Sequence, residues 1–133
     1  MSEEALEVAR RAWEAYERGD FTVAFADASP DLVTYVEAPI PIAGTYHGPE
    51  GLLQSLLDWA EGFDGLDQKA EEFIDLGSGR VIVRVRQTGQ LADSNVSVEA
   101  VFWFLLTVSQ GKIVRVNICN ERADALKAAG LSE

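Results

Sequence analysis

The stretch "VSVEAVFWFLLTV", residues 96–108, places the strongest constraint on the fold. It first alternates between apolar and polar residues, as a strand with one dry face does, and becomes apolar on both faces from Val101 onward. The earlier stretch "RVIVRVRQT", residues 80–88, alternates Val and Ile with Arg and predicts a strand with one wet face. A sheet that contains both strands must be covered on one face, and near "VFWFLL" it must be covered on both.

Turn residues and apolar periodicity divide the rest of the chain. We expect a helix from Ser2 to Gly19, a helix over 21–28, a strand over 31–38, a loop "PIPIAGTYHG", a helix from Pro49 to Phe63, further strands over 67–76 and 112–120, and a closing helix over 121–130. This order favours an α+β fold in which a layer of helices covers one face of a curved antiparallel sheet. A chain of 133 residues fits a single domain, 1–133.

The second face of "VFWFLL" has two candidate covers. The first is a partner subunit, which predicts a homodimer that associates through the sheet. The second is the closing helix, folded across the same face. The sequence leaves both alternatives open.

Charge and composition narrow the classes of partner. The formal net charge of −11 repels phosphate backbones and anionic lipid, so we expect neither nucleic-acid nor membrane binding. Cys119 is the only cysteine and His47 the only histidine, which excludes an internal disulfide and the usual zinc sites. We expect no metal, and we also expect no cofactor. The N-terminus is unlike a signal peptide, and Ala100–Val108 is too short to span a bilayer. A cytoplasmic setting is therefore the expectation.

Several motifs together resemble a known family. They are "AWEAYERGD" (12–20), "GTYHGPEGLLQSLLDW" (44–59), "GKIVRV" (111–116) and "ERADALKAAGL" (121–131). In this order they are similar to the SnoaL-like branch of the nuclear transport factor 2-like superfamily, over nearly the whole chain. The resemblance implies a cystatin-like roll: a cone-shaped, curved antiparallel sheet wrapped around N-terminal helices, with a short C-terminal helix and a pocket inside the cone. Because this fold serves polyketide cyclases, steroid isomerases, epoxide hydrolases, dehydratases and non-catalytic binders, it does not by itself give the function.

The resemblance argues against two of these chemistries. The steroid isomerases keep an aspartate base before a proline at the end of the first strand, where this chain has Ala38. Their second acid would fall near Trp103 and their donor tyrosine near Ala12. The epoxide hydrolases need aspartates around an arginine, but "VRVRQTG" offers Arg84 and Arg86 without an aspartate.

Two residues remain as candidates for general acid or base catalysis. The SnoaL-like cyclases place an aspartate on the final strand, which corresponds to Glu121. The alternative is that Glu121 caps the closing helix, where an acid is favoured, and we rank this alternative first. Imidazole side chains commonly serve as general bases, so His47 could act as a base at a pocket mouth. The alternative, which the resemblance favours, is an exposed loop histidine.

The expected pocket is apolar. Its candidate ligand-binding residues are Tyr16, Tyr35, Val36, Ala38, Trp59, Trp103 and Asn117. Asn117 shares one face of the last strand with Arg115, Cys119 and Glu121, opposite Val116 and Ile118, and the pattern does not decide which of the two faces the cone.

Three hypotheses follow from the sequence. The first is a protein that binds a small hydrophobic molecule in the cone. The second is a cyclase, isomerase or hydratase that uses Glu121 as acid or base on a hydrophobic substrate, without a cofactor. The third is a dimeric assembly module without a ligand. Burial of Glu121 or His47 in an apolar interior would favour catalysis, and exposure of both would favour binding or assembly.

Overall fold

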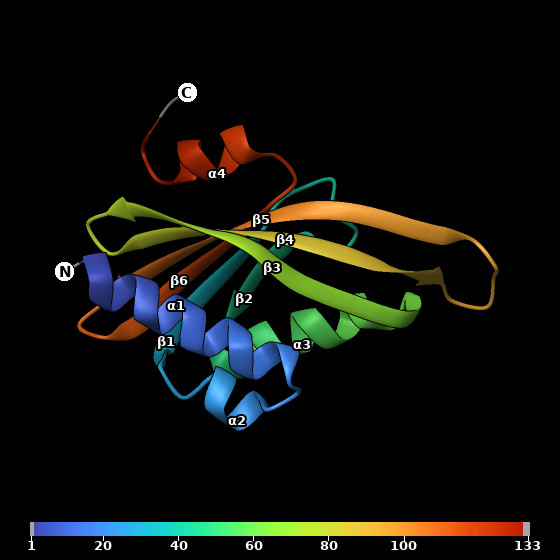
Figure 1. Ribbon diagram of the computed structural model, residues 1–133, viewed down its shortest axis with the longest axis horizontal. Coiled ribbons are helices and arrows are strands. Elements are labelled where there is room, and N and C mark those ends of the chain that lie inside the picture. The colour runs from blue at the N-terminus through green and yellow to red at the C-terminus, as the bar shows by residue number, and fades with distance from the viewer. Residues whose placement is uncertain (1, 132–133) are drawn as a thin grey trace.

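Helices and strands follow one another in the predicted order, with one additional short strand. The computed structural model describes residues 2–131. Its elements are α1 (Ser2–Glu17), α2 (Phe21–Ala24), β1 (Ala28–Val36), β2 (Gly44–His47), α3 (Gly48–Ala60), β3 (Phe63–Gly77), β4 (Arg80–Leu91), β5 (Ser97–Ser109), β6 (Lys112–Cys119) and α4 (Arg122–Ala128). The predicted α+β architecture, with N-terminal helices, a curved sheet and a short C-terminal helix, is confirmed (Figure 1).

The strands form one six-stranded sheet in the order β2-β1-β6-β5-β4-β3. The strands from β3 to β6 make an antiparallel meander, as the turn residues predict. β1 joins the sheet by pairing in parallel with β6, and β2 pairs antiparallel with the other edge of β1. The two halves of the chain are therefore held together by contacts between strands that lie far apart in the sequence.

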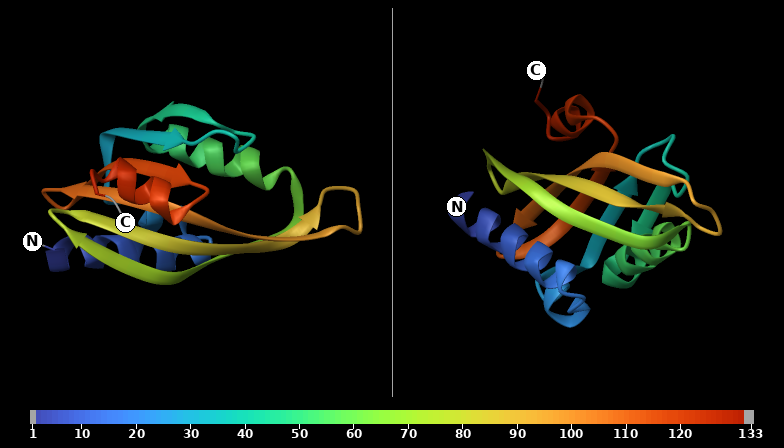
Figure 2. Two further views of the ribbon diagram at one scale, coloured as in Figure 1. Left: turned by 90° about the horizontal axis from the view of Figure 1, so that it is seen from above. Right: turned by 45° about the vertical axis from the view of Figure 1, so that its right-hand side comes forward.

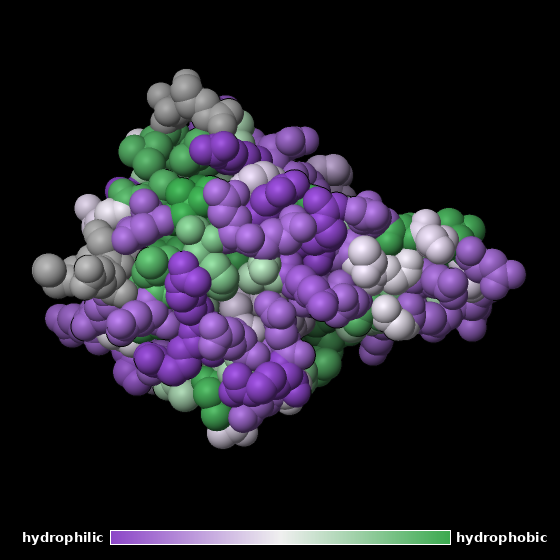
Figure 3. All heavy atoms as spheres, viewed as in Figure 1, coloured by the Kyte–Doolittle hydropathy of each residue, from purple (hydrophilic) through white to green (hydrophobic). Residues whose placement is uncertain are grey.

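The helices cover the two faces of the sheet unequally. α1 and α3 lie on the concave side, which we call the inner face, and α4 lies on the opposite side, the outer face (Figures 1 and 2). The β4–β5 hairpin projects away from the body, and Leu91 and Val96 near its tip are 42% and 54% exposed. Hydrophilic residues cover most of the surface seen in Figure 3, as the charge of −11 predicts.

The main core lies between the inner face and the helices. Its buried members come from alternate positions of the strands and from the apolar stripe of α1, and include Ala5, Ala9, Trp13, Leu32, Leu52, Val81, Val83, Val85, Phe104, Leu106, Val116 and Ile118. Trp13 meets Phe104 edge-on, with ring centroids 5.3 Å apart. Val116 and Ile118 point inward, which decides the face that the sequence left open.

A smaller cluster lies on the outer face under α4. Ala125, Leu126 and Ala129 pack on Ile82, Leu105 and Cys119, and Trp103 lies at the edge of this cluster. The closing helix therefore covers part of the stretch "VFWFLL", as the second alternative expected.

Most boundaries shift by a few residues, and two differences have a clear structural reason. Gly44–His47 was expected in a loop but forms β2, because four residues are too few to show a strand period and their partner, β1, is supplied by tertiary pairing. The second helix ends at Ala24 instead of Ala28, because Ala28 already pairs with Ile113 of β6. A register shift between Ala28 and Val33 accommodates Pro30, which has no N–H for the ladder.

Candidate functional site

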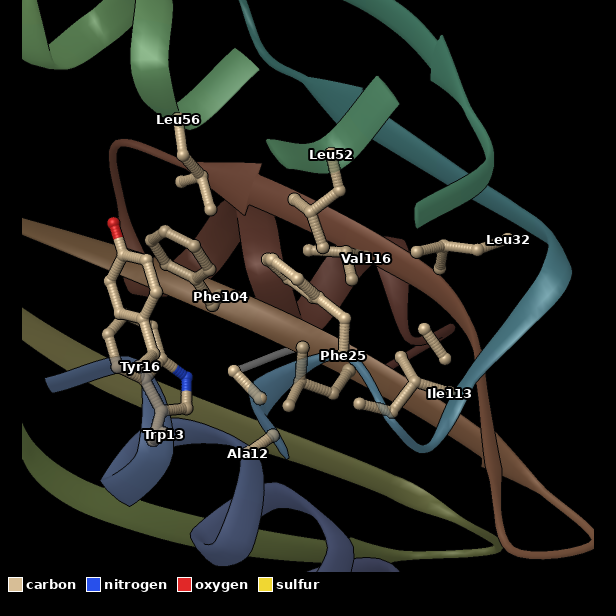
Figure 4. A pocket seen from close by; sticks show the side chains of 13 residues that line it. Ala12, Trp13, Tyr16, Phe25, Leu32, Leu52, Leu56, Phe104, Ile113 and Val116 are labelled. Carbon is tan, nitrogen blue, oxygen red and sulfur yellow. The ribbon is translucent and has the colours of Figure 1, made fainter. Parts of the chain in front are cut away.

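An apolar cavity of about 50 Å³ lies between the helices and the inner face (Figure 4). Its walls come from α1, α2, α3 and the sheet, and consist of Ala12, Trp13, Tyr16, Ala24, Phe25, Ala28, Leu32, Leu52, Leu56, Phe104, Leu106, Ile113 and Val116. None of these residues carries a charge. We call this space the apolar cavity.

A second cavity, of about 20 Å³, lies deeper along the inner face and contains polar groups. We call it the glutamine cavity, because Gln68 of β3 and Gln87 of β4 line it together with Trp59 of α3. Its remaining walls are apolar: Ile40, Ile42, Leu56, Phe102, Phe104 and Ile118. Leu56 and Phe104 therefore separate the two cavities.

A chain of hydrogen bonds links four neutral side chains in this interior. The Tyr16 hydroxyl donates to Gln68 Oε1 at 2.6 Å, and Gln68 Nε2 donates to Gln87 Oε1 at 2.9 Å. Trp59 Nε1 donates to the same Gln87 oxygen at 2.6 Å. These four residues, which we call the polar chain, connect α1, β3, β4 and α3.

The chemistry of Trp59 fixes the direction of every bond in the polar chain. An indole N–H only donates, so the Gln87 atom beside it must be the carbonyl oxygen. Gln68 must then present its NH₂ group to that oxygen and its own oxygen to Tyr16, whose hydroxyl donates. Burial raises the pKa of Tyr16 to about 12, so this hydroxyl keeps its proton throughout the physiological range.

A groove of about 220 Å³ lies beside the polar chain, and we call it the mouth groove because it shares Tyr16, Leu56 and Gln68 with the walls of the two cavities. It is lined by residues of α1, α2, α3 and the start of β3: Tyr16, Glu17, Phe21, Leu53, Leu56, Leu57, Ala60, Leu66, Asp67 and Gln68. Phe21 and Leu57 are 38% and 45% exposed there. Tyr16 and Gln68 thus form part of the wall between the mouth and the two cavities.

The structure brings together only some of the predicted ligand-binding residues. Tyr16 and Trp59 lie in the polar chain, and Val36 is buried in the core of the inner face. Ala38 is exposed in the connection between β1 and β2. The remaining three, Tyr35, Trp103 and Asn117, lie on the outer face, away from both cavities.

The two candidate catalytic residues are both exposed and line neither cavity. His47 occupies the position before α3 and Glu121 the position before α4, and neither side chain makes a capping hydrogen bond. The backbone oxygen of Glu121 accepts from Asp124 N at 3.1 Å, so the residue begins the helix through its main chain. By the criterion set from the sequence, this exposure favours binding or assembly over catalysis.

The sequence reasoning missed Gln68 and Gln87. A signal for Gln87 was present: it continues the dry face of "RVIVRVRQT", on which Val81, Val83 and Val85 are fully buried, and it is itself only 3% exposed. A polar residue in an apolar alternation marks a buried hydrogen bond or a site. Gln68 gave no such signal, because β3 is rich in charged residues on both faces.

A second polar cluster lies where β1 and β6 end beside α4. Glu37 Oε1 accepts from Asn120 N at 3.2 Å, and Asp124 and Cys119 adjoin it. Burial raises the pKa of Glu37, and the nearby Asp124 carboxylate raises it further against the lowering effect of the Asn120 N–H. Burial, with help from both carboxylates, raises the pKa of the Cys119 thiol to about 12.

Residues 2–131 contain no group of three or more His, Cys, Asp and Glu side chains placed to hold a metal ion. None of the helices in that range is both long and apolar enough to cross a lipid bilayer.

The curved six-stranded sheet, its inner helices and the small cavities beneath them define the NTF2-like fold. An NTF2-like protein from Burkholderia thailandensis superposes with a TM-score of 0.80 over 95% of each chain, at 24% identity. TerC, co-crystallised with polyporic acid, gives a TM-score of 0.75 over 89% of this chain and 92% of its own, at 19% identity. A putative SnoaL-like polyketide cyclase from Jannaschia gives 0.72 over 86% and 83%, at 18% identity.

In sequence, the chain is 27% identical to the uncharacterized protein Rv0034 of Mycobacterium tuberculosis, over 88% of this chain and 89% of that protein. No protein-family model matches the chain. The similarity to solved NTF2-like structures confirms the predicted resemblance to this superfamily at the level of the fold.

Proposed function

We propose that this protein binds a small, mostly apolar molecule in the interior between the inner face and helices α1 and α3. The observation that carries the proposal is the neutral character of that interior: apolar walls surround a polar chain made only of tyrosine, glutamine and tryptophan. Such a site can orient a ligand through hydrogen bonds. Within residues 2–131, the two cavities are lined by no carboxylate or imidazole that could move a proton.

Binding requires the interior to open. Cavities of about 50 and 20 Å³ are far smaller than the roughly 300–1,000 Å³ of usual ligand sites. Leu56 lines both cavities and the mouth groove, so we expect movement of its side chain to connect the three spaces. Figure 4 shows Leu56 in the wall of the apolar cavity. The Tyr16–Gln68 hydrogen bond closes the same wall, and a ligand that enters from the groove displaces both.

Two structural neighbours support a ligand-binding role. TerC was crystallised with polyporic acid, and a protein with a ketosteroid isomerase-like fold from Catenulispora acidiphila was crystallised in complex with trimethylamine. The fold thus accommodates small molecules in other proteins.

Catalysis of the cyclase, isomerase or hydratase type is the alternative, and the similarity to a putative SnoaL-like cyclase favours it. It would require Glu121 or His47 to reach the substrate from an exposed position outside the cavities. We therefore place binding first.

The outer face supports a second proposal, a homodimer that associates through the sheet. Arg115 lies over the ring of Tyr35 at 4.7 Å, and Arg84 over the ring of Trp103 at 5.6 Å. Tyrosine, tryptophan and arginine are the side chains most enriched at protein interfaces, and Tyr35 is 38% exposed. Sedimentation of the wild type and of Tyr35→Glu tests this proposal: we expect a dimer that the variant weakens, and a monomeric wild type at micromolar concentration contradicts it.

Titration with the neutral hydrophobic dye N-phenyl-1-naphthylamine tests the binding proposal. We expect a saturable, one-to-one rise in dye fluorescence in the wild type. Ala12→Phe should abolish it, because the added ring fills the apolar cavity that Ala12 lines. Ala26→Phe, the same exchange at an exposed position, should leave it unchanged. Absence of saturable binding, or equal binding by Ala12→Phe, contradicts the proposal.

A further inference from the structure

The amide nitrogen of Gln87 is the feature of the interior that the polar chain does not account for. Gln87 is 3% exposed, and its Oε1 accepts from both Trp59 and Gln68. Its Nε2, whose place is fixed once Trp59 has fixed the oxygen, makes no hydrogen bond to any residue between 2 and 131. Two N–H donors thus remain unused on a buried side chain.

Within residues 2–131, no acceptor pairs with this amide nitrogen. Apart from Gln87, Gln68 and Trp59, the glutamine cavity has apolar walls, among them Ile40, Phe102 and Ile118. Among residues 2–131, the fully buried side-chain atoms without a hydrogen-bond partner are Thr34 Oγ1 and Arg84 Nε, so the Gln87 nitrogen is not fully enclosed by protein atoms. Because Gln87 lines a cavity, a molecule bound there can provide the acceptor that this donor lacks.

The polar chain also shows which donors are already used within the protein. Tyr16 and Trp59 use their single donors within the chain, on Gln68 and Gln87 respectively. Gln87 Oε1 already accepts two hydrogen bonds, so it has little capacity left for a ligand hydroxyl. The ligand group that can pair with the free N–H groups of Gln87 is an acceptor, such as a carbonyl oxygen.

We propose that Gln87 donates an N–H hydrogen bond to an acceptor oxygen of the bound molecule, so that the protein selects apolar carbonyl compounds over hydrocarbons of the same shape. The inference rests on the proposed binding function and names the class of ligand for that site. Trp59 and Gln68 are positioning residues in this arrangement, because they hold the Gln87 oxygen and thereby leave its nitrogen free for the ligand.

Binding of 1-indanone and indane tests the selection, since the two molecules have the same ring system and differ in one carbonyl. Their affinities are measured calorimetrically for the wild type and for Gln87→Met, which keeps the side-chain length and removes the amide. In the variant, we expect the affinity for 1-indanone to fall roughly tenfold relative to the affinity for indane. This is the scale of one hydrogen bond to a neutral group. The different solubilities of the probes in water cancel in this comparison. Gln90→Met, the same exchange at an exposed position of β4, should leave the ratio unchanged.

Infrared spectroscopy of 1-indanone bound to the wild type gives a second readout that does not depend on the folding of a variant. We expect its carbonyl band at a lower wavenumber than in hexane, because a hydrogen bond weakens the C=O bond. Equal affinity ratios in wild type and Gln87→Met, or a carbonyl band at the position found in hexane, overturn the inference while indane binding upholds the proposed function. If the wild type binds neither probe, the proposed function fails and the inference fails with it.

Discussion

The hydroxyl of Tyr16, on the last turn of α1, donates to Gln68 Oε1 of β3 at 2.6 Å across 52 residues of sequence. Both side chains line the mouth groove, and behind them Tyr16 lines the apolar cavity and Gln68 the glutamine cavity. This contact therefore closes the wall between solvent and the interior. A ligand that enters the interior from the groove has to break this hydrogen bond.

Tyr16→Phe should loosen that wall. The change leaves Gln68 Oε1 without its donor, so we expect the free energy of unfolding to fall by about 1 kcal/mol in urea titration. In stopped-flow mixing, N-phenyl-1-naphthylamine should enter the variant faster than the wild type. Tyr46→Phe is the matched control, because Tyr46 donates to the backbone oxygen of Ile42 and lines neither the groove nor the cavities. Tyr46→Phe should lose similar stability, but the dye should not enter it faster. Equal entry rates in all three proteins would mean that the Tyr16–Gln68 hydrogen bond does not control entry.

Leu56→Ala should join the spaces that Leu56 separates. Because this side chain is half-buried, we expect destabilisation of about 1–3 kcal/mol, below the range for fully buried leucines. At the same time, affinity for the dye should rise, since the ligand no longer has to displace the leucine. Leu57→Ala changes the next residue, which is 45% exposed, and should have little effect on stability. Weaker dye binding by Leu56→Ala shows that the leucine contacts the ligand and does not exclude it.

The sequence predicted the elements of the fold well where one face of an element is wet. The stripe of α1 and the alternation of β4 each lead to one buried face, and both elements lie where they were expected. The alternation of apolar and polar residues did not give the inward face of β6, because residues 116–119 are buried on both faces. The main core covers one face and the cluster under α4 covers the other. Alternation gives a register only when one face meets water. The parallel pairing of β1 with β6 likewise depends on tertiary contacts that no local pattern encodes.

The candidate site was predicted only in its aromatic part. Tyr16 and Trp59 were among the aromatic residues expected to line the pocket, and both lie in the polar chain. Tyr35 and Trp103 are also aromatic, but they lie on the outer face of β1 and β5. A single sequence does not show which face of a strand meets the cavity. Gln68 and Gln87 become recognisable as a pair only when β3 and β4 are placed side by side.

Cys119 should be inert in the native protein. It is 4% exposed under α4, and its thiol pKa is raised to about 12, so the reactive thiolate is scarce at pH 8. We expect the reaction with 5,5′-dithiobis(2-nitrobenzoic acid) to be limited by opening of the protein and to become rapid in denaturant. Fast labelling at pH 8 without denaturant would mean that α4 leaves the outer face readily.

Glu121→Gln separates binding from acid–base catalysis. The side chain is exposed and lines neither cavity, so we expect the affinity for the dye and for 1-indanone to stay unchanged. The same result is expected for His47→Gln. If a substrate is found whose turnover is lost in Glu121→Gln while its binding persists, the enzyme alternative replaces the binding proposal.

Glu37→Gln should stabilise the protein at neutral pH. The pKa of Glu37 is raised in the folded state, mainly by burial and also by Asp124, so its charged form is less favourable in the folded than in the unfolded chain. Above the raised pKa this penalty is present in full, and it disappears as pH falls to the ordinary value of 4.5. Glutamine carries no such penalty and can still accept from Asn120 N. The variant should therefore unfold at a higher temperature than the wild type at pH 7, and at nearly the same temperature below pH 4.5.

The local effect has to be separated from a general one. The loss of any acid brings the net charge of −11 closer to zero and so weakens the repulsion between negative charges. Glu72→Gln removes the same charge from an exposed position of β3 and measures the general contribution. Thermal unfolding of the wild type and both variants between pH 3 and pH 8 completes the comparison. An advantage of Glu37→Gln that equals that of Glu72→Gln at every pH would mean that burial beside Asp124 contributes nothing, and the assignment of the raised pKa to this cluster would be wrong.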